Sequence, residues 1–390
     1  MRPAPPPTEA ELLALAELAL SHVSGEGQVT AWWERSLQAS AGAQLARSLM
    51  SVEVLVLVDG RSGFATTSDL GEAALHLAAG RAREAAMRPG RPNRPLAAPV
   101  AGRAHAGYDP AVTRLAPTDL VADGQRWRAG AAKTAIVSTR GVSAYEQRSF
   151  AALTIDVGAT SELSAAGLSP AGIDAEALIA EAGSLAVTGE PASVPPGELP
   201  VVLGPDAVAA VLDLLRPELV PGSRLDASRG TRVVASCVNL SDSPRFAATL
   251  PRSYDVMGTP RQPVPLIQDG VAHRVVSLET GHATQPGGDR ALPEHLVLVG
   301  GGAAAVEELM APIERGLYLP TLELGFEIMD GRRGRRLAPA RARVDALRVL
   351  ATTQALTAGH RTIASQGSAR SVGATVCPAL RAMSGIELHA

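Results

Sequence analysis

The stretch VVLGPDAVAAVLDLLRPE, residues 201–218, joins an extended apolar run to a helix through a Gly-Pro turn. Val201, Val202 and Leu203 predict a buried strand, and apolar residues recur after Pro205 at the spacing of one helix face. A strand that feeds a helix in mid-chain is a frequent place for an active site. Yet this helix has no His, no Cys and no pair of carboxylates one turn apart. The sequence therefore predicts the framework of a site here without its usual chemistry.

The composition is that of a globular protein. At roughly 150 residues per domain, a chain of 390 residues suggests two or three domains. Hydrophobic residues make up 46% and charged residues 19%, so a sizeable core is available. Aromatic residues are only 3% and the net charge is −3, which leaves few base-stacking platforms and no basic excess. We therefore expect no nucleic-acid partner.

The N-terminal apolar stretch does not read as a signal peptide or a membrane span. Thr8 and Glu11 form a capping-box pattern, which predicts an amphipathic helix over residues 8–23. No run of about 18 uncharged apolar residues occurs, so no membrane association is expected. Two cysteines, Cys237 and Cys377, make no disulfide framework, and we expect each to be a small buried hydrophobe. A cytoplasmic location is the simplest interpretation.

A proline-rich segment divides the chain. Residues 189–200, GEPASVPPGELP, contain four prolines and two glycines and predict a linker. We expect an α+β protein with two parts. Residues 1–190 would form an N-terminal α/β domain whose sheet is flanked by helices, and residues 198–390 a strand-rich C-terminal domain.

Local patterns predict several elements on each side of the linker. A hairpin is expected over residues 51–67, because valines alternate on one face before a turn at Asp59 and Gly60. The other expected elements are a helix capped by Ser68–Asp69, a loop at 88–110, a strand pair at 133–157 turning at 139–141, a helix at 174–187, a hairpin at 262–281 turning at Asp269–Gly270, a helix at 303–316 and a solvated basic loop at 330–336.

A search for catalytic or metal-binding patterns finds little. No two of the eight histidines are three or four residues apart, so no helical metal pair exists. His273 and His282 could meet across the predicted hairpin. The glycine-rich residues 299–304 lack the spacing of a phosphate loop, and no G-x-S-x-G elbow occurs. The residues alone indicate a two-domain α+β protein with no evident catalytic centre.

The order of five segments is more informative than any one motif. They are VLVLVDGRSGFATTSDLGEAALHLAAGRAREAA (54–86), AIVSTRGVSAYEQRSFAAL (135–153), PVVLGPDAVAAVLDLL (200–215), YDVMGTPRQPVPLIQDGV (254–271) and HLVLVGGGAAAVEELMAPIERGLYL (295–319). This series resembles the TldD/PmbA (TldE) family, known as modulator-of-gyrase proteins and as two-subunit zinc peptidases. Ser138 stands where that family usually has Asn, and Met257 where it has Glu.

The resemblance also implies where a metal site would lie. In the family's catalytic branch, the helix after Leu-Gly-Pro carries His-Glu-x-x-x-His, whose histidines bind zinc while the glutamate polarises water. Counted from Pro205, this chain has Asp213, Leu214 and Glu218 at those three positions, and Pro217 interrupts the last turn.

A further family ligand is displaced as well. The family's later Cys falls near Ala364 and Ser365, about a dozen positions before Cys377. The resemblance thus implies no catalytic residue and no metal in this chain, as in the family's non-catalytic PmbA/TldE branch.

Three functions follow as hypotheses. The first is a non-catalytic TldE/PmbA-like subunit of a heteromeric TldD/TldE-type zinc metallopeptidase. A TldD-like partner would then hold the zinc, and unfolded or small peptides would be cleaved or matured. The second is a peptide-binding or biosynthetic maturation factor without proteolysis. The third is a self-sufficient zinc hydrolase with relocated ligands, such as Asp213 and Glu218 with His273 or His282. It is disfavoured because residues five apart diverge by about 140° around a helix.

Overall fold

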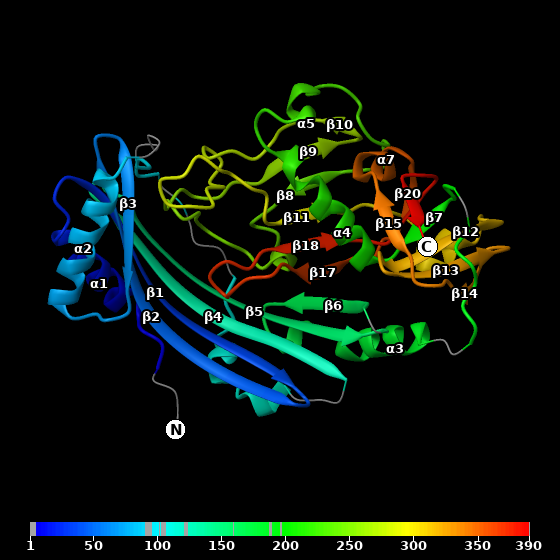
Figure 1. The fold of residues 1–390 in the computed structure, drawn as a ribbon, viewed down its shortest axis with the longest axis horizontal. Coiled ribbons are helices and arrows are strands. Elements are labelled where there is room, and N and C mark those ends of the chain that lie inside the picture. Colours follow the sequence, from blue (N-terminus) through cyan, green and yellow to red (C-terminus); the bar gives the residue numbers. More distant parts are fainter. Residues whose placement is uncertain are drawn as a thin grey trace.

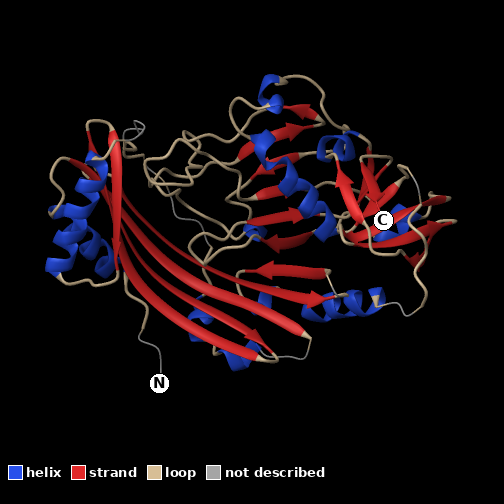
Figure 2. Ribbon diagram, in the orientation of Figure 1, coloured by secondary structure: helices blue, strands red, loops and turns tan. Residues whose placement is uncertain are grey.

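The computed structural model describes residues 5–89, 96–100, 102, 107–120, 124–158, 160–186, 189–195 and 197–389. It shows the expected α+β architecture, with one long curved sheet from the first half of the chain and shorter sheets from the second half (Figures 1 and 2). None of the helices in these ranges is long and apolar enough to cross a membrane.

The first half folds around a six-stranded antiparallel sheet in the order β3-β2-β1-β4-β5-β6. Helix α2 packs against β3 and β2, α1 packs against β4 and β1, and α3 lies beside β5 and β6 (Figure 1). The bounds are α1 Glu9–Ser21, β1 Glu26–Ser40, β2 Ala43–Val58, β3 Arg61–Thr67, α2 Glu72–Met87, β4 Gln125–Ser138, β5 Ser143–Asp156, β6 Glu162–Gly167 and α3 Ala175–Leu185, with 3-10 turns at Pro110–Arg114, Pro117–Leu120 and Pro170–Gly172.

Side-chain alternation explains the two faces of this sheet. Val52, Val54 and Val56 are fully or almost fully buried on the face that α1 and α2 cover. The predicted hairpin turn is confirmed, because Asp59 and Gly60 both have positive φ, 49° and 70°, as a two-residue turn of this kind requires. The predicted Thr8 capping box at the start of α1 is also present.

The second half contains two six-stranded sheets, in the orders β10-β9-β8-β11-β18-β17 and β14-β13-β12-β7-β19-β16, and a small ribbon of β15 and β20. Helix α4 contacts strands of both large sheets. The bounds are β7 Val201–Leu203, α4 Pro205–Leu215, α5 Arg224–Ala227, β8 Leu240–Asp242, β9 Val264–Gln268, β10 Val271–Ala272, β11 Leu296–Leu298, α6 Val306–Met310, β12 Arg315–Thr321, β13 Leu324–Met329, β14 Arg332–Arg336, β15 Arg341–Val344, α7 Ala346–Ala351, β16 Thr353–Leu356, β17 Arg361–Ala364, β18 Ala374–Cys377, β19 Leu380–Ala382 and β20 Ile386–His389, with 3-10 turns at Arg216–Leu219 and Ala247–Thr249.

The sheets are separate, but one of the hydrophobic clusters crosses between the two halves. One buried cluster surrounds α4 within the second half, and another lies under α1 and α2. A third combines Trp33 and Leu153 of the first sheet with Tyr318 and Phe326 of the second half. The division into domains at residues 190 and 198 stays a prediction.

Several predictions for individual elements were wrong. Strand β1 was missed, although it is the central partner of both β2 and β4. The helix expected over 303–316 is only Val306–Met310, since β12 already begins at Arg315. The basic segment expected as a solvated loop forms strand β14.

The start of α2 also differs from expectation. Its N-cap is Gly71, whose backbone N–H donates to Asp69 Oδ1 at 3.0 Å, so Asp69 orders the turn before the helix. Residues 90–95, 101 and 103–106 of the loop predicted at 88–110 lie outside the described residues.

Candidate functional site

The helix α4 has the predicted start and the predicted interruption. It ends at Leu215, and the 3-10 turn that follows contains Pro217. Of the three positions predicted to correspond to the family's zinc motif, Asp213 is 59% exposed and pairs with Arg216 at 2.8 Å. Leu214 is 56% exposed. Glu218 accepts a hydrogen bond from the backbone N–H of Arg224 at 3.1 Å. Both carboxylates are thus engaged in local contacts near the end of the helix.

The residues where the resemblance places the family's cysteine also take part in local structure. Ala364 ends β17, and the Ser365 hydroxyl accepts a hydrogen bond from the backbone N–H of Gly373 at 2.9 Å. Cys377 is fully buried, as predicted, and its thiol donates to the Pro205 carbonyl at 3.2 Å. Burial raises the pKa of this thiol. Cys237 is only partly buried.

The two histidines proposed as relocated ligands lie in different environments. His273 is exposed, whereas His282 is fully buried. Nε2 of His282 lies 2.8 Å from Asp242 Oδ1, and Nδ1 lies 2.9 Å from the Thr280 hydroxyl. Both ring nitrogens of His282 therefore have partners. Across the described ranges, no three His, Cys, Asp or Glu side chains gather as metal ligands would.

A cluster of buried charges joins the two halves of the molecule; we call Glu146, Arg148, Arg252, Arg261 and Glu294 the polar junction. Arg148, which is 3% exposed, projects from β5 and donates five hydrogen bonds to backbone carbonyls. The five acceptors are Leu250, Pro251, Ala369, Arg370 and Val372. Burial lowers the pKa of Arg148 to about 10, so it stays cationic at neutral pH.

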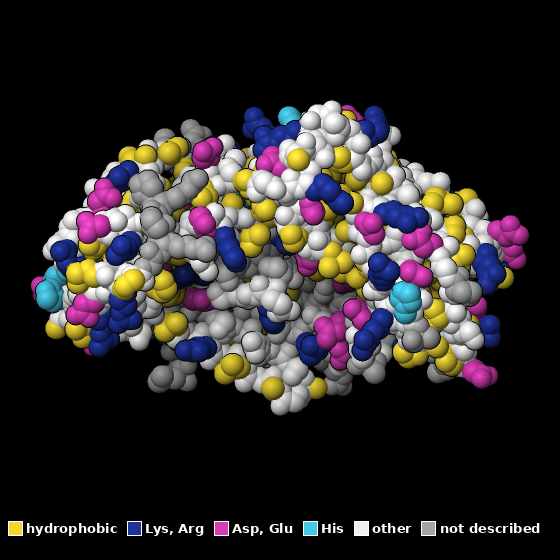
Figure 3. Space-filling model, turned by 45° about the horizontal axis from the view of Figure 1, so that its top comes forward, with side chains coloured by type: hydrophobic (Ala, Val, Ile, Leu, Met, Phe, Trp, Pro, Cys, Tyr) yellow, Lys and Arg dark blue, Asp and Glu magenta, His cyan; other side chains and the backbone are white. Residues whose placement is uncertain are grey.

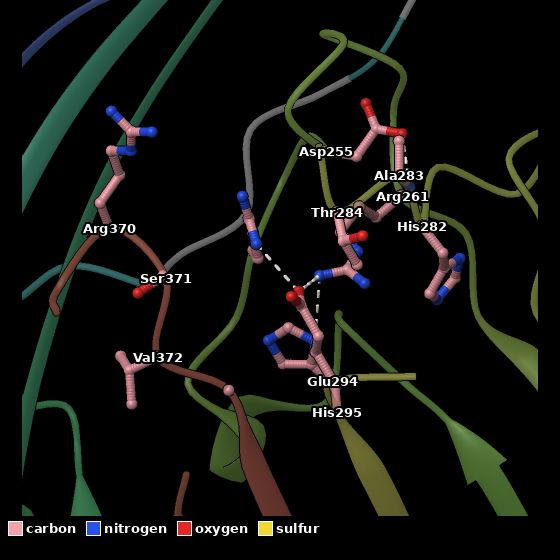
Figure 4. A network of polar contacts seen from close by, with 12 residues as sticks. Asp255, Arg261, His282, Ala283, Thr284, Glu294, His295, Arg370, Ser371 and Val372 are labelled. Atoms are coloured by element: carbon pink, nitrogen blue, oxygen red, sulfur yellow. Dashed lines mark hydrogen bonds and ion pairs between the residues drawn. The ribbon is translucent and has the colours of Figure 1, made fainter. Parts of the chain in front are cut away.

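Two arginines fix Glu294 in the junction. Its Oε2 accepts from Arg252 at 2.9 Å and also pairs with Arg261 (Figure 4). Burial alone would raise the pKa of Glu294, but the two guanidinium groups outweigh it and hold the pKa well below its usual range. On the other side, Glu146 Oε2 accepts from the backbone N–H of Ser253 at 2.8 Å.

A histidine and a further arginine lie next to the junction. Nδ1 of His295 is 3.4 Å from Arg261, and burial together with this arginine lowers the pKa of His295 well below its ordinary value. The Arg370 guanidinium lies 4.0 Å from the ring centre of Trp32 on β1, within the range of a cation–π contact. At neutral pH Glu294 is therefore ionised and His295 neutral, and neither has a pKa suited to exchanging a proton there.

The polar junction is better suited to holding the two halves of the molecule together than to acid–base catalysis. The arginine network fixes loops of the second half against the concave face of the first sheet. The sequence reasoning missed these residues, although one signal was present. Glu146 and Arg148 are two residues apart in a predicted strand, so they share one face of a sheet.

Charges on the outer surface are mixed. On the face shown in Figure 3, Lys and Arg side chains alternate with Asp and Glu, and no broad area carries a single sign. This distribution agrees with the nearly balanced composition, 36 basic against 39 acidic residues.

Comparison with known proteins supplies a family for part of the chain. Residues 196–336 match the family model described as the PmbA/TldA metallopeptidase C-terminal domain. None of the curated proteins matches the sequence.

Solved structures resemble the whole chain. TldE from Thermococcus kodakarensis has a TM-score of 0.78 at 14% sequence identity, covering 98% of this chain and all of that protein. A proposed modulator of DNA gyrase from Thermotoga maritima has a TM-score of 0.75 at 17% identity, covering 98% and 99%. A similar protein from Bacteroides thetaiotaomicron has a TM-score of 0.73 at 16% identity, covering 98% of each chain. The family resemblance predicted from the sequence is confirmed: residues 196–336 belong to the PmbA/TldA metallopeptidase C-terminal domain family, and the chain as a whole has the fold of the TldD/PmbA proteins.

Proposed function

We propose that this chain is a non-catalytic, TldE/PmbA-like subunit of a two-subunit zinc metallopeptidase that acts on unfolded or small peptides. A TldD-like partner would hold the zinc, and this chain would help enclose the peptide. The observation that carries the proposal is the state of α4. Asp213 pairs with Arg216, Leu214 is apolar, and Glu218 bonds to the backbone of the next helix. The likeness to TldE over 98% of the chain supports the same assignment.

The sharpest test uses two purified chains. This protein and a TldD-like chain from the same genome, carrying His-Glu-x-x-x-His, would be prepared separately and mixed. We expect co-elution in gel filtration, about one zinc per TldD-like chain by elemental analysis, and peptidase activity in the mixture. Stoichiometric zinc on the isolated chain, lost together with an activity of its own, would refute the proposal.

A second candidate is peptide binding without proteolysis, and the edge of the first sheet favours it. Strand β2 pairs with β1 along residues 43–57 but with β3 only along 52–58. Residues 43–49 are exposed or partly so, with no strand on their other side among the described residues. Such an edge can take up an extended peptide through main-chain hydrogen bonds. Peptide binding by the isolated chain, without any association with a TldD-like chain, would favour this function.

The proposal also includes a cytoplasmic location. It is supported by Cys237 and Cys377, both of which are free thiols.

A further inference from the structure

A cavity away from the polar junction contains a polar group with no partner. The cavity has a volume of about 740 Å³ and lies where α3, α6, β12 and β14 meet. Its lining includes Tyr318, which is 5% exposed. The Tyr318 ring packs against Phe326 at 6.1 Å between ring centres, but its hydroxyl makes no hydrogen bond to any other described residue.

Tyr318 lines the cavity in a charged environment. The charged residues that act on it are Glu181, Glu307, Arg333 and Arg361, and all four line the same cavity. The hydroxyl oxygen lacks a described partner but is not sealed from solvent, so water in the cavity can reach it. A ligand in the cavity would supply that partner.

Two of the charged residues in the wall, Arg361 and Glu181, already form an ion pair. Arg361 pairs with Asp206 at 2.8 Å and also with Glu181, so one guanidinium group is shared by two carboxylates. Arg333 lies 5.3 Å from the centre of the Phe326 ring and donates to the Ser184 carbonyl at 2.9 Å, without a carboxylate partner.

Among the residues that line the cavity, three guanidinium groups stand against two carboxylates, and the third carboxylate, Asp206, pairs with Arg361 from outside the wall. Arg332 lines the wall and forms no ion pair within the described part of the chain. Glu307 is the one carboxylate in the wall without a described counter-ion, and Arg332 and Arg333 are the two wall guanidinium groups without a described carboxylate partner. Met310 and Ala379 add apolar surface to the same wall. Guanidinium groups bind planar oxyanions through paired hydrogen bonds.

We propose that this cavity binds a small organic carboxylate, with Arg332 and Arg333 pairing with the carboxylate, the Tyr318 hydroxyl donating to it, and the apolar wall holding its hydrocarbon part. The volume is that of a small-ligand site. The site is distinct from the polar junction and from the positions that replace the zinc motif.

The test uses N-acetyl-leucine as probe, with its amide and inorganic phosphate as comparisons. Isothermal titration of the full-length protein should show saturable binding of the acid, with the amide at least about tenfold weaker. Phosphate separates a general anion site from a carboxylate site, and phosphate binding as tight as that of the acid would overturn the assignment. No saturation by the acid at about 10 mM would overturn it as well.

Variants assign the binding groups. Arg332→Gln should weaken binding of the acid by about tenfold or more, because it removes a charged partner. Arg335→Gln is the matched control, since Arg335 lies on the same strand, is 68% exposed and pairs with Glu327 outside the cavity wall. Tyr318→Phe should weaken binding severalfold while leaving the unfolding temperature unchanged, since the hydroxyl has no described partner to lose. Equal affinities for Arg332→Gln and Arg335→Gln, or no loss in Tyr318→Phe, would contradict the proposal.

Discussion

Single buried side chains connect the two halves of this molecule. Arg148 joins β5 to two separate stretches of the second half through its five carbonyl acceptors. Asp206 has a similar role near the start of α4, where Oδ1 accepts from both the backbone N–H and the hydroxyl of Ser164 on β6, at 2.9 and 2.8 Å. Its Oδ2 pairs with Arg361 on β17. Each side chain satisfies polar groups that come from distant parts of the sequence.

Asp206 should give the protein a distinctive pH dependence. Burial raises its pKa to about 6, while Arg361 opposes this shift. Because this pKa is above that of the unfolded chain, protonation favours the native state. The contribution is complete below about pH 4 and is lost as the pH rises through about 6. Asp206→Asn cannot titrate, so the stability advantage of the natural protein over the variant should grow by up to about 3 kcal/mol from about pH 7 to pH 4.

Urea unfolding at several pH values measures this difference. Asp156→Asn is the control, since Asp156 is 60% exposed and its pair with Arg126 lies on the surface. The plot of its unfolding free energy against pH should run parallel to that of the natural protein. If the curve of Asp206→Asn is also parallel, the carboxyl titrates normally in the folded state.

At the scale of elements, close packing between strand and helix fixes where α2 lies. Gly63 on β3 faces the backbone of α2, and a Cβ there would lie 2.2 Å from the Ala82 carbonyl oxygen and from the Ala86 nitrogen. Only glycine permits this approach. Gly80 in α2 has open space around its Cα.

These two glycines should respond in opposite directions to the same substitution. Gly63→Ala should destabilise the protein by about 3 kcal/mol, because the helix must move away from the strand. Gly80→Ala should stabilise it by about 0.5 to 1 kcal/mol, because alanine loses less backbone entropy in a helix. Thermal unfolding of both variants checks the pair. A tolerated Gly63→Ala would mean that α2 and β3 are less closely packed than described.

At the scale of the whole molecule, the linker contributes little to holding the two halves together, whereas the hydrophobic core contributes much. The described residues of 189–200 form no helix or ladder strand, and Ala192 makes a single bridge to Leu337. In contrast, the third hydrophobic cluster and the bonds of Arg148 cross between the halves. A cut in the linker would break the chain without removing these contacts.

Limited proteolysis should therefore cleave the chain into two fragments that stay folded together. We expect an early cut within 189–200, giving two bands on a denaturing gel. The two fragments should elute together in gel filtration under native conditions, because the buried apolar and polar contacts between them remain. Fragments that elute separately would show that each half holds its own core, and first cuts elsewhere would place the boundary at a different segment.

Local signals were enough to predict much of the secondary structure and the family. The Thr8 capping box, the Asp59–Gly60 turn and the strand–helix unit at 201–215 each depend on residues within a few positions of one another, so the sequence displays them directly. Strand β1 was missed because Trp32, Trp33 and Arg35 interrupt the alternation of its apolar residues. All three are buried, and Arg35 can be buried there only because it donates to a carbonyl of another segment, that of Leu115.

The polar junction and the carboxylate cavity depended on the tertiary structure. Arg148 reaches Val372, 224 positions away, and Asp206 reaches Arg361, 155 positions away. No periodicity links residues so far apart, since their proximity follows from how the sheets pack. The sequence alone, through its resemblance to the family, led to the prediction that α4 lacks the metal ligands. Only the folded chain decided which charges are paired, which hydroxyl lacks a partner and where a ligand would fit, because pairing and burial are properties of the packed molecule.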